Sequence, residues 1–262
     1  MQHIIWDINP IMIQMGSIKI HWYGILFISS FFIGLEILKW IYKRENRKVE
    51  VLENLVFYIF IGAIIGARLV HCYFYQPSYY LEHPFEVLAV WKGGLASHGG
   101  MIGVLITLLF FVKYHKESYL WLLARFTIVG ALTAAAIRIG NFINSEIIGL
   151  PTELPWAIVF QRIDTIPRHP VQLYEALAYI FIFILLLSIY KKSKFTTSTK
   201  ILPPLFLVTL FTARFFIEYT KTRQADYTTG LPFSTGQMLS IPLIIIGLVW
   251  LTFAIRSMRE RT

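Results

Sequence analysis

Cysteine is almost missing from these 262 residues, and charged side chains are scarce. The single cysteine, Cys72, excludes a disulfide within the chain, so the sequence gives no indication of the redox compartment. Charged residues make up 15% of the chain, against about 25% in ordinary globular proteins. With 56% hydrophobic residues and a mean hydropathy of +0.60, too few polar side chains remain to cover a water-facing surface. The composition therefore excludes disordered, collagen-like and coiled-coil chains and predicts a protein of the lipid bilayer.

Seven long apolar runs organise the chain. A run of about 18 or more apolar residues can span the hydrocarbon core, because a helix rises about 1.5 Å per residue. These runs cover approximately residues 20–38, 54–75, 98–114, 120–138, 171–190, 201–219 and 237–255. The sequence thus predicts an all-α integral membrane protein with seven transmembrane helices, residues 1–262 forming a single transmembrane domain. Residues 1–19 are amphipathic, and we expect them along the membrane interface.

The basic residues assign the helix ends to the two sides of the membrane. Most of the 24 lysines and arginines fall in four stretches, namely Lys39 to Lys48, Lys113 to Lys116, Lys191 to Lys200 and Arg256 to Arg261. By the positive-inside rule this face is cytoplasmic, so the N-terminus is expected outside and the C-terminus in the cytoplasm. Because the charge of +9 is divided among short loops, we expect membrane lipid as a partner and no nucleic acid.

Four arginines lie inside or at the end of an apolar run: Arg68, Arg125, Arg138 and Arg214. An arginine at the bilayer centre costs at least about 2.5–3.5 kcal/mol, so each needs an explanation. Arg125 is near a cytoplasmic helix end, and we expect its side chain to reach the headgroups. The other three lie near outer helix ends, beside the loops that hold most polar side chains. The sequence thus predicts a working site at the outer leaflet. Residues 141–170 there either fold as a small extracytoplasmic cap or lie flat on the membrane.

The stretch from Arg138 to Gly149 combines an arginine with several polar side chains. Arg138 and Asn141 are three residues apart, so at a helix end they share a face. A guanidinium offers a planar fork that fits a phosphate, and Gly140 lets another part of the chain approach closely. An alternative interpretation is an interfacial helix cap in which Arg138 pairs with Glu146.

Ser97-His98-Gly99-Gly100 places a histidine beside two glycines. Histidine can act as a base or an acid near neutral pH, and the glycines would leave its ring accessible to a bulky lipid. A purely structural role for His98 is the alternative. His21 and His71 lie on other segments without carboxylates at ligand spacing, so we predict neither a metal site nor a cofactor.

Arg214 and Glu218 stand four residues apart and can form a salt bridge on a helix. The other interpretation is that Arg214 and Arg138 converge on an anion, which at a membrane surface is a phospholipid phosphate. Ahead of the fifth apolar run, Arg168-His169-Pro170 precedes Gln172 and Glu175. Proline suits a first helical turn, and we interpret the glutamine and the glutamate as caps of free amides.

Together these motifs resemble the bacterial prolipoprotein diacylglyceryl transferases. The resemblance covers nearly the whole chain and rests on four stretches: Ser97 to Gly100, Arg138 to Gly149, His169 to Glu175, and Arg214 to Glu218. It implies a multi-pass enzyme of the bacterial inner membrane, with one catalytic domain facing the outer leaflet. Such an enzyme moves the sn-1,2-diacylglyceryl group of phosphatidylglycerol onto the lipobox cysteine thiol of a preprolipoprotein signal peptide. A thioether forms and glycerol 1-phosphate is released.

The resemblance also suggests roles for individual residues. It implies that His98, Arg138 and Arg214 are catalytic. We expect these residues to bind substrate: Tyr23, Arg68, Arg138, Asn141, Asn144, Glu146, Gly149 and Glu218. The chain departs from the family pattern at Ile137, where glycine is usual, and at Leu210, where some members have tyrosine. The family's downstream arginine corresponds either to Lys221 or to Arg223.

A chemical hypothesis combines these residues. The nucleophile comes from the substrate, because Cys72 has no paired base nearby in sequence. A peptide thiol with a pKa of about 8.5 must first lose its proton. His98 takes that proton directly or through water, or else donates a hydrogen bond to the lipid. Arg138 and Arg214 hold the phosphate and stabilise the charge that develops on the departing glycerol phosphate.

Two other functions fit a seven-helix membrane protein, namely a receptor with an outer ligand pocket and a transporter of a small anion. The short basic inner loops disfavour the receptor. The transporter would need charges and broken helices near the midplane, whereas the charges here lie near one leaflet.

Overall fold

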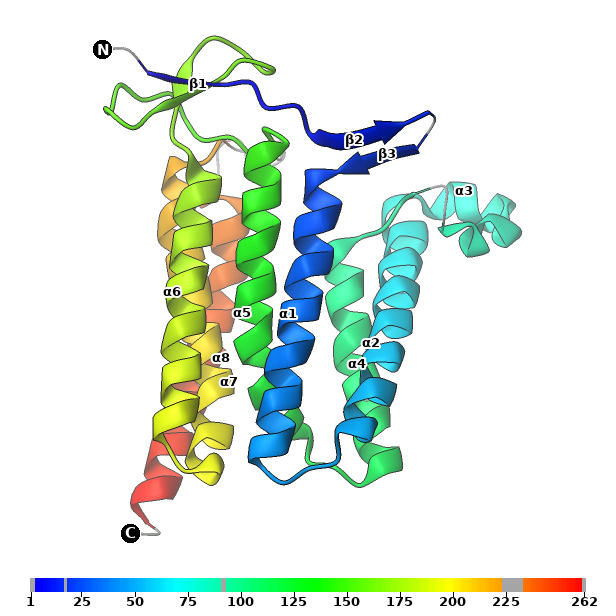
Figure 1. The fold of residues 1–262 in the computed structure, drawn as a ribbon, viewed down its shortest axis with the longest axis vertical. Helices are drawn as coiled ribbons and strands as arrows, with labels where there is room; N and C mark the ends of the chain where they lie inside the picture. The colour runs from blue at the N-terminus through cyan, green and yellow to red at the C-terminus, as the bar shows by residue number, and fades with distance from the viewer. Residues whose placement is uncertain (1–2, 17, 91–92, 223–232, 261–262) are drawn as a thin grey trace. The chain divides into compact units, whose positions relative to one another are not determined.

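Seven helices among the described residues are long and apolar enough to cross a membrane, which confirms the predicted number of spans. The computed structural model describes residues 3–16, 18–90, 93–222 and 233–260 (Figure 1). The long helices are α1 (Trp22–Arg44), α2 (Val49–Val70), α4 (Ser97–His115), α5 (Tyr119–Ile143), α6 (Val171–Lys192), α7 (Phe195–Ile217) and α8 (Thr235–Arg259). The all-α membrane class is confirmed, with only short strands outside the helices.

The chain forms two compact units. The first contains residues 1–38 and 124–262, and the second contains residues 39–123. The boundaries therefore fall inside α1 and α5. That residues 1–262 act as a single catalytic domain stays a prediction.

Several helices extend beyond the apolar runs that predicted them. α5 reaches Ile143 rather than ending at Arg138, and α1 continues to Arg44. Hydropathy marks only the part of a helix that suits hydrocarbon, whereas the backbone hydrogen bonds continue into polar turns. As a result, Arg138 and Asn141 lie on regular helix, where their spacing determines which face they occupy.

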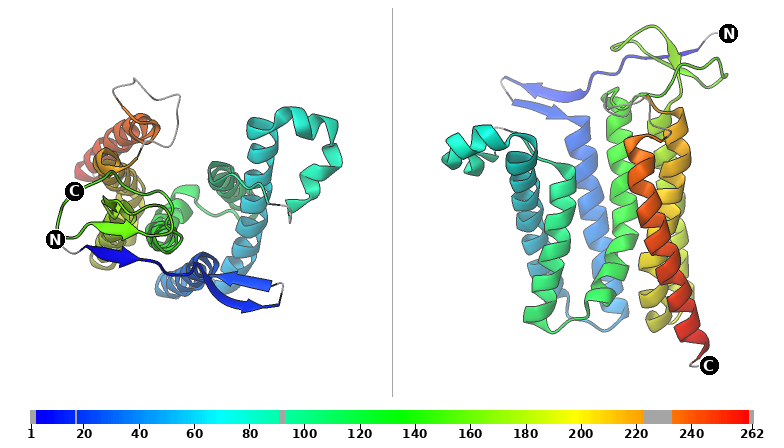
Figure 2. Two further views of the ribbon diagram at one scale, coloured as in Figure 1. Left: turned by 90° about the horizontal axis from the view of Figure 1, so that it is seen from above. Right: turned by 180° about the vertical axis from the view of Figure 1, so that it is seen from behind.

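In the first unit, α7 packs along both α6 and α8 (Figure 2). Near the start of α7, Arg125 of α5 is fully buried. Its Nη1 donates to Thr199 Oγ1 at 2.6 Å, and its guanidinium lies 5.4 Å from the centre of the Tyr190 ring. The expectation that Arg125 reaches the headgroups is therefore wrong. A hydroxyl and an aromatic ring stabilise its charge inside the protein.

A small sheet covers the ends of α5 and α6 in the first unit (Figure 1). Its central strand β4 (Ile158–Phe160) pairs in parallel with β1 (Ile4–Trp6) and antiparallel with β5 (Pro167–Arg168). Trp6 donates from Nε1 to the carbonyl of Phe142 at 3.1 Å, and its ring packs against the cluster of Phe142, Ile158 and Phe160. The segment after α5 thus folds as a cap, held by apolar contacts with the N-terminal strand.

The N-terminal segment also supplies a hairpin. β2 (Ile11–Met15) and β3 (Ile18–His21) pair antiparallel, and β3 leads directly into α1. Apolar and polar side chains alternate in part of this segment, which suits a strand as well as an amphipathic surface segment. These strands differ from the interfacial amphipathic segment that the sequence predicted for residues 1–19.

In the second unit, glycines bring α2 and α4 into close contact. A Cβ atom on Gly62, Gly66, Gly99 or Gly103 would collide with the facing helix. Small residues four apart allow membrane helices to approach this closely. α2 continues into a π-helical turn, η1 (His71–Tyr75), followed by α3 (Pro77–Glu82) and the short η2 (Pro84–Leu88).

Candidate active site

Arg138 lies near the end of α5 and faces Glu175 of α6. Its Nε is 3.0 Å from Glu175 Oε2, and its Nη1 donates to Asn141 Oδ1 at 3.3 Å. Asn141 in turn donates from Nδ2 to a Glu146 carboxylate oxygen at 2.9 Å. The predicted shared face of Arg138 and Asn141 is therefore confirmed. Glu146 is linked to Arg138 through Asn141, and Arg138 forms its ion pair with Glu175 among the described residues.

The loop that follows α5 turns sharply. Ser145 and Ile147 have positive φ angles of 57° and 56°, which is uncommon for any residue but glycine and strained for β-branched isoleucine. Asn144 donates to the Glu146 carboxylate at 3.1 Å, and Gln172 Nε2 donates to the Glu146 carbonyl at 2.5 Å. These bonds hold the loop in its strained shape and leave the side chain of Glu146 exposed.

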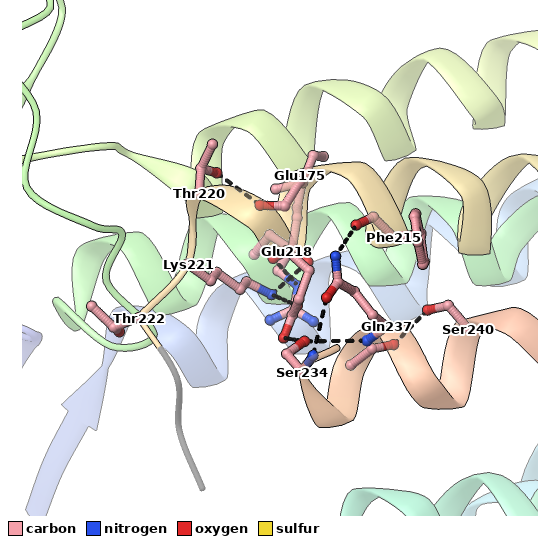
Figure 3. Close-up of polar contacts among 12 residues, drawn as sticks. Glu175, Phe215, Glu218, Thr220, Lys221, Thr222, Ser234, Gln237 and Ser240 are labelled. Atoms are coloured by element: carbon pink, nitrogen blue, oxygen red, sulfur yellow. Dashed lines mark hydrogen bonds and ion pairs between the residues drawn. The ribbon is translucent and has the colours of Figure 1, made fainter. Parts of the chain in front are cut away.

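Glu175 is the centre of a buried group of charges (Figure 3). Its side chain is 0% exposed, and its Oε1 accepts a hydrogen bond from Lys221 Nζ at 2.8 Å. The same Nζ is 3.3 Å from Glu218 Oε2. Lys221 thus joins a carboxylate of α6 to one that follows α7, while Arg138 brings in α5. One lysine and one arginine share the Glu175 carboxylate.

Glu218 follows α7 and lies at the N-terminus of α8. Its Oε1 accepts from Ser234 Oγ at 3.0 Å, and Ser234 forms a capping box with Gln237 at the start of α8. A Cβ atom on Gly236 would lie 2.5 Å from the Glu218 carboxyl group. Free amides at a helix N-terminus stabilise a carboxylate. Among the ion pairs of the described residues, Glu218 is therefore paired with Lys221 rather than with Arg214.

Arg214 lies in the last turn of α7. Its Nε is buried and has no hydrogen-bond partner in the described part of the chain. Tyr179, buried on α6, donates from its hydroxyl to Glu175 Oε1 at 3.5 Å. Arg138 and Arg214 both lie within electrostatic reach of this hydroxyl. The two arginines thus lie in the neighbourhood of one hydroxyl group, and their convergence on a phosphate stays a prediction. Their roles toward a substrate stay predictions.

Tyr23, in the first turn of α1, packs against Gly140 of α5. A Cβ atom at Gly140 would lie 2.6 Å from Cδ2 of the tyrosine ring, so glycine is needed for this approach. The Tyr23 hydroxyl lies within electrostatic reach of Arg138 and Glu146. The fold thus brings Tyr23 next to the segment from Arg138 to Gly149. Gly149, at the end of that stretch, is buried and forms a β-bridge with Lys221.

The capping interpretation of the residues that open α6 is wrong. The N-cap is Pro170, without a side-chain cap, and Glu175 and Gln172 have the partners described above. Just before the helix, Arg168 Nη2 donates to Asp164 at 2.6 Å. The hydrogen bonds from Arg168 hold the pKa of Asp164 below its usual range. This ion pair fixes the edge of the cap beside the charged group.

Two predicted site residues lie in the second unit. His98 is exposed in the first turn of α4. Arg68, near the end of α2, is 3% exposed, and all three of its nitrogens donate to backbone carbonyls. Nε donates to Val87 at 2.9 Å, Nη1 to Gly93 at 2.5 Å, and Nη2 to Glu86 at 2.6 Å. A phosphate could reach this guanidinium only if some of these bonds broke. That Arg68 binds substrate stays a prediction.

Within the described ranges, no group of three or more histidine, cysteine, aspartate and glutamate side chains could hold a metal ion. Cys72 is fully buried. Leu210 is also buried on α7, and Arg223 lies outside the described residues.

Comparison with known proteins adds a second kind of observation. A model of the prolipoprotein diacylglyceryl transferase family matches residues 10–253. A protein of Tolumonas auensis is 51% identical over 94% of this chain and 95% of its own length. Relatives from Chloroherpeton thalassium and Bacteroides fragilis are 46% and 38% identical, over 94% and 95% of this chain and 92% and 94% of their own. All three are named phosphatidylglycerol–prolipoprotein diacylglyceryl transferases.

This chain belongs to that family. The predicted resemblance is therefore confirmed, and a transferase of the membrane replaces the receptor and the anion transporter as the interpretation of the fold. Both arginines of the family resemblance lie in the first unit, near the ends of α5 and α7.

Sequence reasoning missed Glu175, Lys221 and Tyr179 as members of this group. Glu175 was explained locally as a cap, and Lys221 was only one of two candidates for a family position. One signal was available: Glu175 lies in a long apolar helix with no basic residue within one turn. A carboxylate in such a helix needs a partner from elsewhere in the chain, because an uncompensated charge in the membrane is costly.

Proposed function

We propose that this chain transfers the sn-1,2-diacylglyceryl group of phosphatidylglycerol to the lipobox cysteine thiol of a preprolipoprotein. Its relatives carry a name that includes both substrates. The observation that carries the proposal is the pair of arginines beside the buried Glu175 and Tyr179: Arg138 pairs with Glu175, which accepts from Tyr179, and Arg214 lies within electrostatic reach of Tyr179. The Nε of Arg214 is buried and has no hydrogen-bond partner in the described structure. A buried guanidinium nitrogen without a partner requires an acceptor, and a lipid phosphate oxygen supplies one.

The proposed reaction is a displacement at carbon. The thiolate sulfur attacks the glycerol carbon that carries the phosphate ester, so a C–S bond forms and the C–O bond breaks. The electron pair of that bond leaves with the phosphate oxygen, and glycerol 1-phosphate departs. The phosphate thereby changes from a singly charged diester to a monoester with a charge of about −1.5 to −2. Arg138 and Arg214 stabilise the additional negative charge most strongly as it develops.

The nucleophile belongs to the peptide substrate. The chain's own thiol, Cys72, is fully buried in the second unit. We assign the proton of the incoming thiol to His98, which is exposed at the start of α4 and accepts the proton directly or through water. Tyr23, Asn141 and Glu146 orient the headgroup and the peptide. A histidine that only donates a hydrogen bond to the lipid is the alternative for His98.

The proposed location is the bacterial inner membrane, with the active site toward the outer leaflet. The basic turn between α6 and α7 is then cytoplasmic, and the cap that covers the ends of α5 and α6 is extracytoplasmic. Arg138 and Arg214 both lie near helix ends. Charges at that depth suit the headgroup of a lipid rather than a transport site at the midplane.

Mass spectrometry tests this function. The purified protein in micelles containing phosphatidylglycerol should add one diacylglyceryl mass to a lipobox peptide. The same peptide with serine in place of cysteine, or with its thiol blocked, should gain nothing. Arg138→Lys keeps the charge but loses the fork, and we expect its turnover to fall by about tenfold or more. Mass gain on the blocked peptide, or no gain on the free one, would reject the proposed thioether transfer.

A further inference from the structure

We infer that Lys221 is a positioning residue: by holding Glu175 and Glu218, it keeps Arg138 and Arg214 available to the substrate phosphate. This inference rests on the proposed function and deepens it. It concerns a side chain that need not touch the lipid, and it explains why two carboxylates lie beside two arginines that must bind an anion.

The backbone around Lys221 is fixed by the loop that follows α5. Lys221 forms a β-bridge with Gly149. On either side, the Leu150 amide donates to the Thr220 carbonyl at 2.8 Å, and the Thr222 amide donates to the Ile148 carbonyl at 3.3 Å. The side chain is 5% exposed, and its Nζ lies between the two carboxylates (Figure 3). The backbone hydrogen bonds thus fix the residue, and the two carboxylates fix its ammonium group.

The charges of this group nearly cancel. Glu175 and Glu218 are negative, and Lys221, Arg138 and Arg214 are positive, so one positive charge remains among these five described side chains. A phosphodiester brings one negative charge. Without Lys221, two carboxylates would face two arginines and could neutralise both of them.

The geometry indicates how that neutralisation would occur. Glu218 stands four residues after Arg214, a spacing at which the two side chains can pair on one helix face. Lys221 and the N-terminus of α8 hold the Glu218 carboxylate instead. Glu175 is shared in the same way, with one oxygen toward Lys221 and the other toward Arg138. If Glu175 Oε1 lost its contact with Lys221, the Glu175 carboxylate would bind Arg138 more strongly and draw it away from the lipid.

Kinetics of Lys221→Met measure this effect directly. We expect the KM for phosphatidylglycerol to rise about tenfold or more, because a charge-assisted contact is lost to a competing carboxylate. kcat should fall as well, because the same guanidinium groups stabilise the charge that develops on the departing phosphate. Lys221→Arg should restore KM to within about threefold, since arginine can also bridge two carboxylates. Lys200→Met is the matched control: Lys200 donates to Ser257 at 3.0 Å near the start of α7, and its loss should leave KM unchanged.

A second substitution separates positioning from stability. In the Lys221→Met background, Glu218→Gln removes the carboxylate that would capture Arg214, so it should lower KM again. In the wild-type background the same change should not lower KM. If Lys221→Met fails to fold, Gly236→Ala displaces the Glu218 carboxylate without removing a charge, and KM should rise as well. Gly130→Ala, at a helical glycine with nothing within 4 Å, is its control.

Binding is measured beside turnover, as the rise in melting temperature with short-chain phosphatidylglycerol. Absence of turnover by the wild-type protein would reject the proposed function, while the binding shift would still report on Lys221. An unchanged KM and binding shift in Lys221→Met would overturn the inference. The inference would also be overturned if KM rose in Lys221→Met and Glu218→Gln did not lower it again.

Discussion

At the scale of single residues, four arginines in or at the ends of membrane helices have four different environments. Arg68 is saturated by loop carbonyls, and Arg125 is held by a hydroxyl and an aromatic ring. Arg138 shares a carboxylate with a lysine, and the Nε of Arg214 has no partner in the described structure. A guanidinium that already donates to several carbonyls has little left to offer a ligand, so Arg138 and Arg214 are better placed than Arg68 and Arg125 to bind a substrate.

His98 provides a prediction at the same scale. If it takes the proton of the incoming thiol, His98→Gln should lower kcat by about 10²–10⁴-fold, the usual contribution of a general base. The measurement is the initial rate of diacylglyceryl transfer at saturating lipid. His115→Gln is the control on the same helix, since His115 is exposed at the far end of α4 and stacks on Phe111. A rate for His98→Gln within about tenfold of wild type would instead favour the hydrogen-bond role.

The sequence could predict contacts between residues that are close together in the chain. Arg138 and Asn141 share a helix face as their spacing indicated. The pairing of Glu175 with Lys221 could not be predicted, because the two residues are far apart in sequence and each had a local explanation. Glu218 had a nearby arginine, yet its partners come from Lys221 and the start of α8.

At the scale of elements, the helices were predictable and the strands were not. A membrane span leaves a long apolar run, whereas β1 and β4 have only three residues each and pair across most of the chain.

The partners of the glycines could not be predicted from sequence either. Gly99, interpreted as access for lipid to His98, packs against α2 at Gly66. The sequence shows that a small residue is needed there but not what approaches it.

The close packing of α2 on α4 predicts that a larger residue at Gly103 destabilises the protein. Gly103→Ala would place a Cβ against the Gly62 carbonyl, so the helices must separate. We expect the variant to lose about 1–3 kcal/mol of stability, as overpacked cores do. Thermal unfolding in detergent, followed by circular dichroism, measures the loss. Gly130→Ala on α5 meets nothing within 4 Å and should be unchanged or slightly more stable. Equal melting temperatures for the two variants would contradict the close contact.

At the scale of the whole molecule, the distribution of charge suggests an orientation. α6 runs from the cap at Val171 to the basic turn at Lys192, and its 22 residues give a length of about 33 Å. One end therefore carries the sheet and the charged group, and the other carries lysines. The positive-inside rule places the lysine end in the cytoplasm and the arginine pair toward the outer leaflet.

Single cysteines test this orientation, because the native Cys72 is fully buried and should not react. Gln161→Cys lies on the exposed loop of the cap, and Lys194→Cys lies on the exposed turn between α6 and α7. A membrane-impermeant maleimide added to intact spheroplasts should label the first and spare the second. After the membrane is permeabilised, both should react, and the wild-type protein should stay unlabelled in each case. The reverse pattern would place the arginines at the cytoplasmic leaflet, where an exported lipobox cysteine could no longer reach the phosphate that they are proposed to hold.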